Sequence, residues 1–312
     1  MELQQLRYFV AVADSGRFTA AARDLHVAQP SVSKQIRKLE TDLGAVLLER
    51  RKAGVALTAA GLILLPWAKR VLADLDGARA EVAGLATLER GRLSVGATPS
   101  LSTVLLPRVL ASFHGRHPGV SLSVVEAGSH DLVGRLASGE LDVALVILPV
   151  PREQLFETLP LLREELVLAV ARGHPLAKRK VVRIAELRGV PLVMFRDGYD
   201  LRSATIAACE RAGFHPTFAI EGAEMDGVLR MAAAGVGVAV VPSMVVDRAG
   251  PLVAVRIGRP ALSRSVGVAF RRDRQHSRAA DAFVTQLRAS VREREWRAAL
   301  PAGVAILEPG GR

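Results

Sequence analysis

A short run of polar and basic side chains near the N-terminus has the types and spacing needed to contact nucleic acid. At helical spacing, one face carries amide, hydroxyl and cationic groups: Gln29, Ser31, Ser33, Lys34, Arg37 and Lys38. Amides and hydroxyls can hydrogen-bond to base edges, whereas lysine and arginine can do so or neutralise phosphates. This pattern predicts a helix that enters a DNA major groove, although a merely solvated helix face has the same composition.

Three short helices must position this face. Leu3, Leu6 and Phe9 follow helical spacing, and Ser15-Gly16 ends that first helix. A second helix follows Phe18, and its alanines let two steeply crossing helices approach closely. The third helix has Pro30 in its first turn, where the missing N–H costs nothing. Its expected buried stripe consists of Val32, Ile36, Leu39 and Leu43, and Gly44 ends it.

A longer motif strengthens this prediction. The pattern AA-x-x-L-x-V-x-QPSVS-x-QI-x-x-LE runs from Ala21 to Glu40, and LTAAG follows at residues 57–61. The chain thereby resembles the LysR-type transcriptional regulators. The resemblance implies that Gln29, Pro30, Ser33 and Lys34 face the bases, with Ser31 and Arg37 nearby. Ala28 replaces the family's usual hydroxyl residue, which weakens the helix cap by about 0.5–2 kcal/mol.

A basic turn follows the third helix. The segment ERRKAGVA lies between the apolar residues Leu47 and Leu57, as expected for the β wing of a winged helix. Arg50, Arg51 and Lys52 are then placed near phosphates or the minor groove. A surface hairpin with solvated charges is the alternative for any one of these residues.

A single long helix is expected from Ala59 to about Leu88. Its apolar stripe has a mean spacing close to the 3.5 residues of a coiled coil and consists of Leu64, Trp67, Val71, Leu75, Ala78, Val82 and Leu85. Pro66 should bend the helix or remove one hydrogen bond. A second copy of the chain is the natural partner of such a stripe, and packing onto the downstream domain is the alternative. The family resemblance implies that such dimers commonly join into a homotetramer.

The remaining residues alternate between strands and helices, which predicts an α/β domain with a mainly parallel sheet. The layout is similar to the two-lobed effector domain of the LysR family, which resembles type 2 periplasmic-binding proteins. The expected organisation is α/β overall, with a winged helix-turn-helix at 1–58, a linker helix at 59–90 and an effector domain at 91–300. Lobe I is expected at about 91–161 and 266–300, lobe II at about 162–265, and a flexible tail at 301–312.

The cleft between the lobes is the expected ligand site. Loops after parallel strands point there, and they place two sets of residues: Thr98, Pro99, Ser100 and Ser129 from one lobe, and Phe195, Arg196, Tyr199 and Met225 from the other. Hydroxyls, helix amides and Arg196 would suit a carboxylate or phosphate. Helix capping or core packing explains several of these residues equally well. Ile147 stands where some family members carry arginine, which argues against a dianionic aromatic ligand.

Composition and sequence patterns argue against several classes of protein. The formal charge of +11 favours an anionic partner, while no apolar run reaches the ~18 residues of a membrane span. The N-terminus lacks a secretory signal pattern, so a cytoplasmic protein is expected. Cys209 is the single cysteine, which excludes an internal disulfide and argues against redox sensing, because peroxide-sensing family members use two cysteines. The histidines show no metal-ligand spacing, and no nucleophile–base pair points to an enzyme.

The leading hypothesis is a LysR-type regulator that binds double-stranded operator DNA as a homodimer or homotetramer, with binding or promoter bending controlled by a small molecule. RNA polymerase is a further partner if the protein activates transcription. A constitutive DNA-bending protein and, less favoured, a solute-binding protein are the alternatives. The resemblance implies that such regulators frequently control a divergently transcribed neighbour and their own gene, so the adjacent genes are the simplest clue to the effector. The effector, the operator sequence and the direction of regulation are not encoded in any motif.

Overall fold

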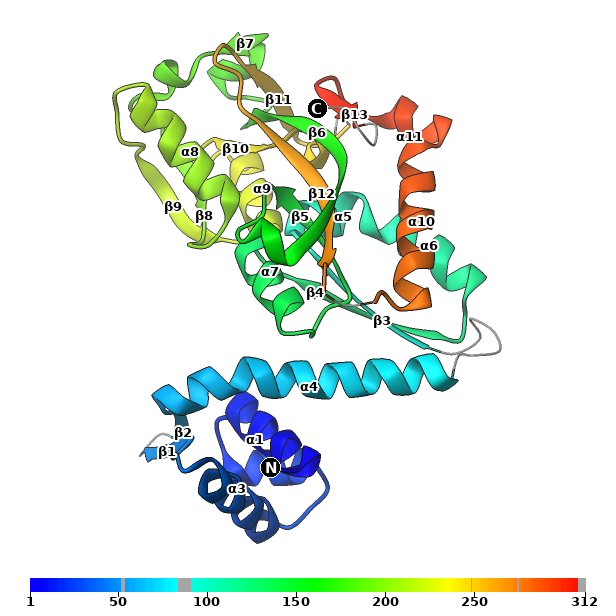
Figure 1. Ribbon diagram of the computed structural model, residues 1–312. Helices are drawn as coiled ribbons and strands as arrows, with labels where there is room; N and C mark the ends of the chain where they lie inside the picture. The colour runs from blue at the N-terminus through cyan, green and yellow to red at the C-terminus, as the bar shows by residue number, and fades with distance from the viewer. Residues whose placement is uncertain (52–53, 84–90, 248, 274, 308–312) are drawn as a thin grey trace. The chain divides into compact units, whose positions relative to one another are not determined.

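The computed structural model describes residues 1–51, 54–83, 91–247, 249–273 and 275–307, without the side chains of Arg50 and residues 80–83. The chain divides into two units. The first contains the N-terminal helices and the long helix α4, and the second contains the α/β domain (Figure 1).

Three helices and a two-stranded wing build the first unit. They are α1 (Leu3–Ser15), α2 (Phe18–Asp24), α3 (Gln29–Leu43), β1 (Leu48–Arg51) and β2 (Gly54–Leu57), with the two strands antiparallel. Gly16 and Gly44 end α1 and α3 with φ near 65°, a left-handed conformation that glycine adopts at little cost. Phe9, Val32 and Leu39 are fully buried between the helices. The predicted winged helix-turn-helix is therefore confirmed.

Helix α4 (Ala59–Ala83) continues through Pro66 and packs against α1. The Thr58 hydroxyl accepts a hydrogen bond from the Gly61 amide at 3.1 Å. A Cβ on Gly61 would lie 2.2 Å from the Leu47 carbonyl oxygen, so this close approach requires glycine. Ala68 is buried against the helical core, and Lys69 Nζ pairs with Asp14 Oδ1 at 2.9 Å. One side of α4 is thereby fixed to the first unit.

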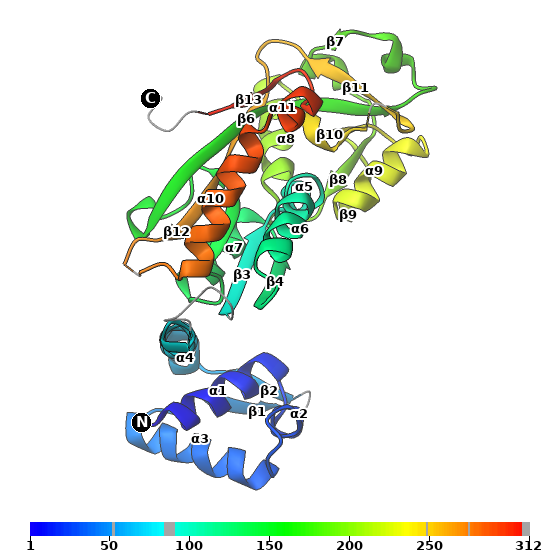
Figure 2. The ribbon, with the colours of Figure 1, turned by 90° about the vertical axis from the view of Figure 1, so that its right-hand side faces the viewer.

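The first lobe of the second unit is an α/β sheet. Parallel strands β4 (Val120–Glu126), β3 (Gly91–Ala97) and β5 (Val143–Leu148) are joined by the antiparallel strand β12 (Ser263–Arg271) and by β6 (Phe156–Ala171). Its helices are α5 (Pro99–Val104), α6 (Leu106–Arg116), α7 (Ser129–Ala137), α10 (Arg278–Arg292) and α11 (Arg294–Ala299). Helices α6 and α10 lie side by side, and Phe113 meets Phe283 edge to face between them (Figures 1 and 2).

The second lobe has its own core, formed by residues between Leu166 and Ile257. The second half of β6 pairs with β10 (Ala239–Pro242) and β11 (Leu252–Ile257), and β11 pairs with β7 (Val181–Val182). Parallel strands β8 (Leu192–Phe195) and β9 (Phe218–Ala223) form a separate pair. The helices are α8 (Asp200–Arg211) and α9 (Met225–Ala233), and 3-10 turns cover Glu153–Leu155, Pro175–Lys178, Ile184–Leu187 and Ser243–Val245. Strand β6 is shared by both lobes.

Two sequence-based expectations need correction. The sheet is mixed rather than mainly parallel, because β12, β10 and β11 all run antiparallel to β6. The expected flexible tail is wrong for Val304–Ile306, which forms β13 and pairs antiparallel with β6. The side chains of Val304 and Ile306 pack on the first lobe's core, since alternate residues of a strand point to one face. Residues 308–312 lie outside the described residues.

Candidate functional site

Helix α3 presents a row of exposed polar groups. Ser31, Lys34, Arg37 and Lys38 are exposed together with Pro30, and Gln29 is half-buried. Ala28 is the N-cap residue and makes no side-chain hydrogen bond, as its methyl group requires. The first turns of α3 therefore carry the amide, hydroxyl and cationic groups that are needed to contact base edges and phosphates.

Two residues of α3 lie elsewhere than expected. Ser33 is only 7% exposed, so it lies in the buried stripe instead of on the outer face. Position 33 is three residues before Ile36 and adjacent to Val32, which places it at the edge of the apolar side of the helix. Its hydroxyl accepts a hydrogen bond from Arg37 Nη2 at 3.4 Å. Leu43, expected inside, is 41% exposed in the last turn.

The lysines of α3 differ in their partners. Lys38 Nζ lies 2.6 Å from Glu2 Oε1, and this hydrogen bond raises the pKa of Lys38 above its usual range. Lys34 forms no ion pair within the described residues, so its whole charge is available to an anion. Lys34 is therefore the strongest candidate on this helix for a DNA contact.

For the wing, the structure describes fewer side-chain contacts than for helix α3. Arg51 is exposed and its Nη2 lies 3.3 Å from Glu49 Oε2. Arg50 belongs to β1, but its side chain lies outside the described structure, as does the whole of Lys52. Their predicted phosphate contacts stay predictions.

Helix α4 has an apolar face that nothing in the first unit covers. Ile63, Trp67 and Val71 are 69%, 60% and 42% exposed. Leu64, which the predicted stripe includes, is half-buried against the helical core instead, and Leu75 is half-buried while Ala78 is exposed. The side chain of Val82 and all of Leu85 lie outside the described residues. The exposed face thus shares Trp67 and Val71 with the predicted stripe, and Ile63 takes the place of Leu64.

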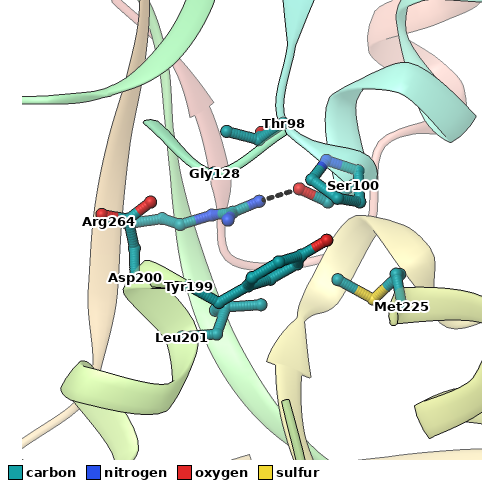
Figure 3. A pocket seen from close by; sticks show the side chains of 9 residues that line it. Thr98, Ser100, Gly128, Tyr199, Asp200, Leu201, Met225 and Arg264 are labelled. Carbon is teal, nitrogen blue, oxygen red and sulfur yellow. Dashed lines mark hydrogen bonds between the residues drawn. The ribbon is translucent and has the colours of Figure 1, made fainter. Parts of the chain in front are cut away.

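The start of α5 and the starts of α8 and α9 converge on one cavity in the second unit. Thr98, Pro99 and Ser100 come from the first lobe, and Tyr199 and Met225 face them from the second lobe (Figure 3). Gly128, Asp200, Leu201 and Arg264 complete the lining. Five of the eight predicted effector residues therefore lie together, but the cavity's free volume is only about 10 Å³, room for a single water molecule.

Arg264 fills this cavity. Its guanidinium lies between Thr98 and Tyr199, and Nη2 donates to Ser100 Oγ at 2.7 Å (Figure 3). Nε and Nη2 both donate to Glu164 Oε1, at 2.8 Å and 2.7 Å. The side chains of Arg264 and Glu164 are 8% and 0% exposed, so this is a buried ion pair. Charges buried this way are costly unless they are paired and hydrogen-bonded.

A larger cavity adjoins Arg264. It has a volume of about 360 Å³ and is bounded by Ile147, Leu148, Arg163, Leu166, Asp200, Leu201, Ala204, Ser263, Arg264 and Ser265. Arg163 is exposed and donates to Ser263 Oγ at 2.9 Å. The two cavities share Asp200, Leu201 and Arg264. A small organic molecule has room in the second cavity without any rearrangement.

Three predicted effector residues do not line either cavity. The Ser129 hydroxyl is buried and accepts a hydrogen bond from the Ile147 amide at 3.1 Å, which ties α7 to β5. Phe195 is 1% exposed and stacks on Tyr199. Arg196 Nε pairs with Glu224 Oε1 at 2.6 Å, so its charge is already neutralised. The predicted anion partner thus has an internal partner instead.

Tyr199 is held between these groups. Its hydroxyl donates to Glu224 Oε2, and the Arg196 guanidinium lies 4.7 Å from its ring centre. Burial, reinforced by Glu224, raises the pKa of the Tyr199 phenol, which stays protonated at neutral pH. Tyr199 therefore forms a fixed neutral wall of the cavity.

Sequence reasoning missed Arg264 and Glu164. They are 100 positions apart, so no local motif joins them, and they meet because β12 pairs with β6. The available signal was the charged residues within two otherwise apolar strands, three in LREELVLAVA and one in SRSVGVAF. Such residues are rarely buried without a partner.

Other chemistries find no support in the described part of the chain. It contains no cluster of side chains suited to a metal ion. No helix in it is long and apolar enough to cross a membrane. Cys209 is fully buried in α8, and burial raises the pKa of its thiol.

The exposed polar helix, the wing and the two-lobed domain together define a DNA-binding regulator class, and comparison with known proteins agrees. Residues 3–62 match the bacterial regulatory helix-turn-helix protein model of the lysR family, and residues 86–292 match the LysR substrate binding domain model. The protein belongs to the LysR family of transcriptional regulators, which are not enzymes.

Among its relatives, the DNA-binding transcriptional dual regulator OxyR of Escherichia coli K12 is 32% identical over 274 residues, covering 87% of this chain and 90% of that protein. A full-length OxyR variant from Pseudomonas aeruginosa aligns with a TM-score of 0.71 at 30% identity, covering 92% of this chain and 98% of the other. The LysR-family regulator CbnR in complex with its target DNA aligns with a TM-score of 0.68 at 31% identity, covering 93% and 100%.

Proposed function

We propose that this LysR-family regulator reads its operator through the first turns of α3, chiefly Gln29 and Lys34, with the wing on the flanking phosphates. The observation that carries the proposal is the row of exposed groups on α3, in which Lys34 has no competing carboxylate among the described residues. Similarity to CbnR, whose structure includes its target DNA, supports it.

We further propose that the protein acts as a homodimer or homotetramer through the exposed face of α4, and that a small-molecule effector acts at the cleft between the lobes. Ile63, Trp67 and Val71 supply the apolar surface for assembly. The effector-domain match and the two adjoining cavities support the ligand site. Contact with RNA polymerase follows if the protein activates transcription, and action on DNA places it in the cytoplasm.

Several relatives are named hydrogen peroxide-inducible genes activators. A disulfide switch within one chain needs two cysteines, and this chain has one, which is buried. We therefore propose that the signal is not the formation of a disulfide within one chain.

A gel-shift series with the DNA upstream of the protein's own gene tests the DNA-binding proposal. If Lys34 contacts a phosphate, Lys34→Ala should weaken binding to all sequences and reduce the slope of log K against log salt by about 0.9 per subunit bound. Gln29→Ala should mainly reduce discrimination, by about 1–3 kcal/mol at one base pair. Lys178→Ala, which removes an exposed lysine of the other unit, is the matched control and should bind like wild type. Wild-type binding by both α3 variants would show that α3 is not the recognition helix.

A further inference from the structure

The cleft between the two lobes already has an occupant. The Arg264 side chain extends from β12 into the space where α5, α8 and α9 begin, and leaves only about 10 Å³ free (Figure 3). Its guanidinium bonds to Ser100 at the start of α5 in the first lobe, and Tyr199 and Leu201 of the second lobe line the opposite side of the cavity. A group of this chain therefore occupies the space that a bound ligand would take.

The walls of the cavity suit a planar cation. Glu164 supplies a carboxylate that is 0% exposed, and Ser100 supplies a hydroxyl oxygen 2.7 Å from Arg264 Nη2. A guanidinium carries donors in a planar fork that matches a carboxylate. An anionic ligand here would bring a second negative charge beside a buried carboxylate, which is unfavourable.

The hydrogen bonds of Arg264 leave two nearby buried oxygen atoms without a partner among the described residues. Both Arg264 donors that reach Glu164 converge on Oε1, while Glu164 Oε2 has no hydrogen-bond partner among the described residues. Thr98 Oγ1, in the same cavity wall, also lacks one there. Buried polar atoms in this state cost free energy. A guanidinium free of the backbone can form the two-pronged arrangement with both carboxylate oxygens that Arg264 does not form.

We propose that Arg264 is a tethered ligand of the cleft, and that a small molecule acting there competes with it for Glu164 and Ser100 through a guanidinium or amidinium group. The displaced side chain has space beside it, because Arg264 also lines the 360 Å³ cavity. In the absence of such a molecule, Arg264 keeps its bonds to Glu164 and Ser100 and fills the cleft. This inference rests on the proposed role of the cleft as the effector site, yet it can be tested without DNA.

Chemical rescue tests the proposal. In full-length Arg264→Ala, ethylguanidinium should fill the vacated space and raise the melting temperature saturably, by about 3–6 °C at tenfold its Kd. The neutral analogue ethylurea should not, because it lacks the charge that Glu164 requires. In wild type, where ethylguanidinium must displace Arg264, the same rise should require a higher concentration of the ligand.

Two variants serve as controls. Arg230→Ala removes an exposed arginine of α9 that lines neither cavity and should respond like wild type. The double variant Arg264→Ala/Glu164→Gln keeps the space but loses the carboxylate, so the rescue should disappear. Absence of a saturable rise in Arg264→Ala, or an equal rise in the double variant, would overturn the proposal.

If Arg264→Ala does not fold, refolding yield replaces melting temperature as the measurement. Recovery of folded protein with ethylguanidinium and not with ethylurea supports the tethered ligand, and equal yields with both overturn it. The same variant in gel shifts tests the regulatory part. A change of operator affinity on adding ethylguanidinium, which in wild type requires a higher concentration, supports it, and an unchanged affinity refutes that part. The Lys34→Ala variant tests the DNA-binding proposal separately, so its result does not depend on the outcome of the ethylguanidinium experiments.

Discussion

Replacing Arg264 by methionine should destabilise the effector domain strongly. Methionine keeps most of the stem volume but leaves the Glu164 carboxylate, which is 0% exposed, without its cationic partner. Breaking a buried pair by removing one partner typically costs about 3–5 kcal/mol. For a domain of this size, that corresponds to a fall of about 6–20 °C in melting temperature.

The double variant Arg264→Met/Glu164→Leu should recover most of this loss. Two apolar side chains of similar volume remove both charges together, and such replacements are often neutral or stabilising. The coupling energy from the double-mutant cycle should therefore be at least about 3 kcal/mol. Arg163→Met, which replaces the exposed arginine next to Glu164 on β6, is the matched control and should change stability by less than about 0.5 kcal/mol.

Tryptophan fluorescence during urea unfolding is a suitable assay. The chain has two tryptophans, and Trp296 is 7% exposed against the first lobe's core. In a Trp67→Phe background, Trp296 alone reports the transition of that lobe, which avoids mixing the two units. A coupling energy below about 1 kcal/mol would refute the reasoning, because the pair would then behave like a solvent-exposed one.

Three further predictions concern other parts of the chain. Trp67→Asp should lower the mass in light scattering while Trp67→Phe preserves it, and an unchanged mass for the aspartate variant contradicts assembly through α4. Because burial raises the pKa of Cys209, the native thiol should resist a disulfide reagent at pH 8 but react in urea, and fast native labelling argues against this. The Glu165 amide donates a hydrogen bond to the Gly303 carbonyl oxygen. Deleting residues 301–312 should therefore speed the hydrogen–deuterium exchange of this amide at least about tenfold. Deleting 308–312 alone should not, and equal protection in both truncations would contradict a structural role for β13.

Local patterns were sufficient for the first unit. The spacing of Phe9, Val32 and Ile36 and the glycines at 16 and 44 specify three short helices within about forty residues, so sequence-local rules apply throughout. The error at Ser33 came from treating a boundary position as solvent-facing. Its side-chain environment depends on the neighbouring helix and not on its own polarity.

The cleft was predictable only in part. Thr98 and Ser100 follow β3 in the first lobe and Tyr199 follows β8 in the second, so their convergence at the cleft follows from the expected two-lobed topology. Arg196 was assigned to the effector site by its charge alone. Glu224, which neutralises it, lies on a different element, so local sequence did not reveal the pair. The strand β13 was missed because three residues of apolar alternation are too short to identify before their partner strand is known.

The sequence by itself determined the family, the winged helix, the amphipathic α4 and the two-lobed domain, since each is encoded in contiguous residues or in a motif. Only the tertiary structure decided what fills the cleft. Glu164 and Arg264 are brought together by the pairing of β6 with β12, and Ser100 joins them across 164 positions. Electrostatic pairing acts through space over a few ångströms, so the partner of a buried charge cannot be found from its neighbours in sequence.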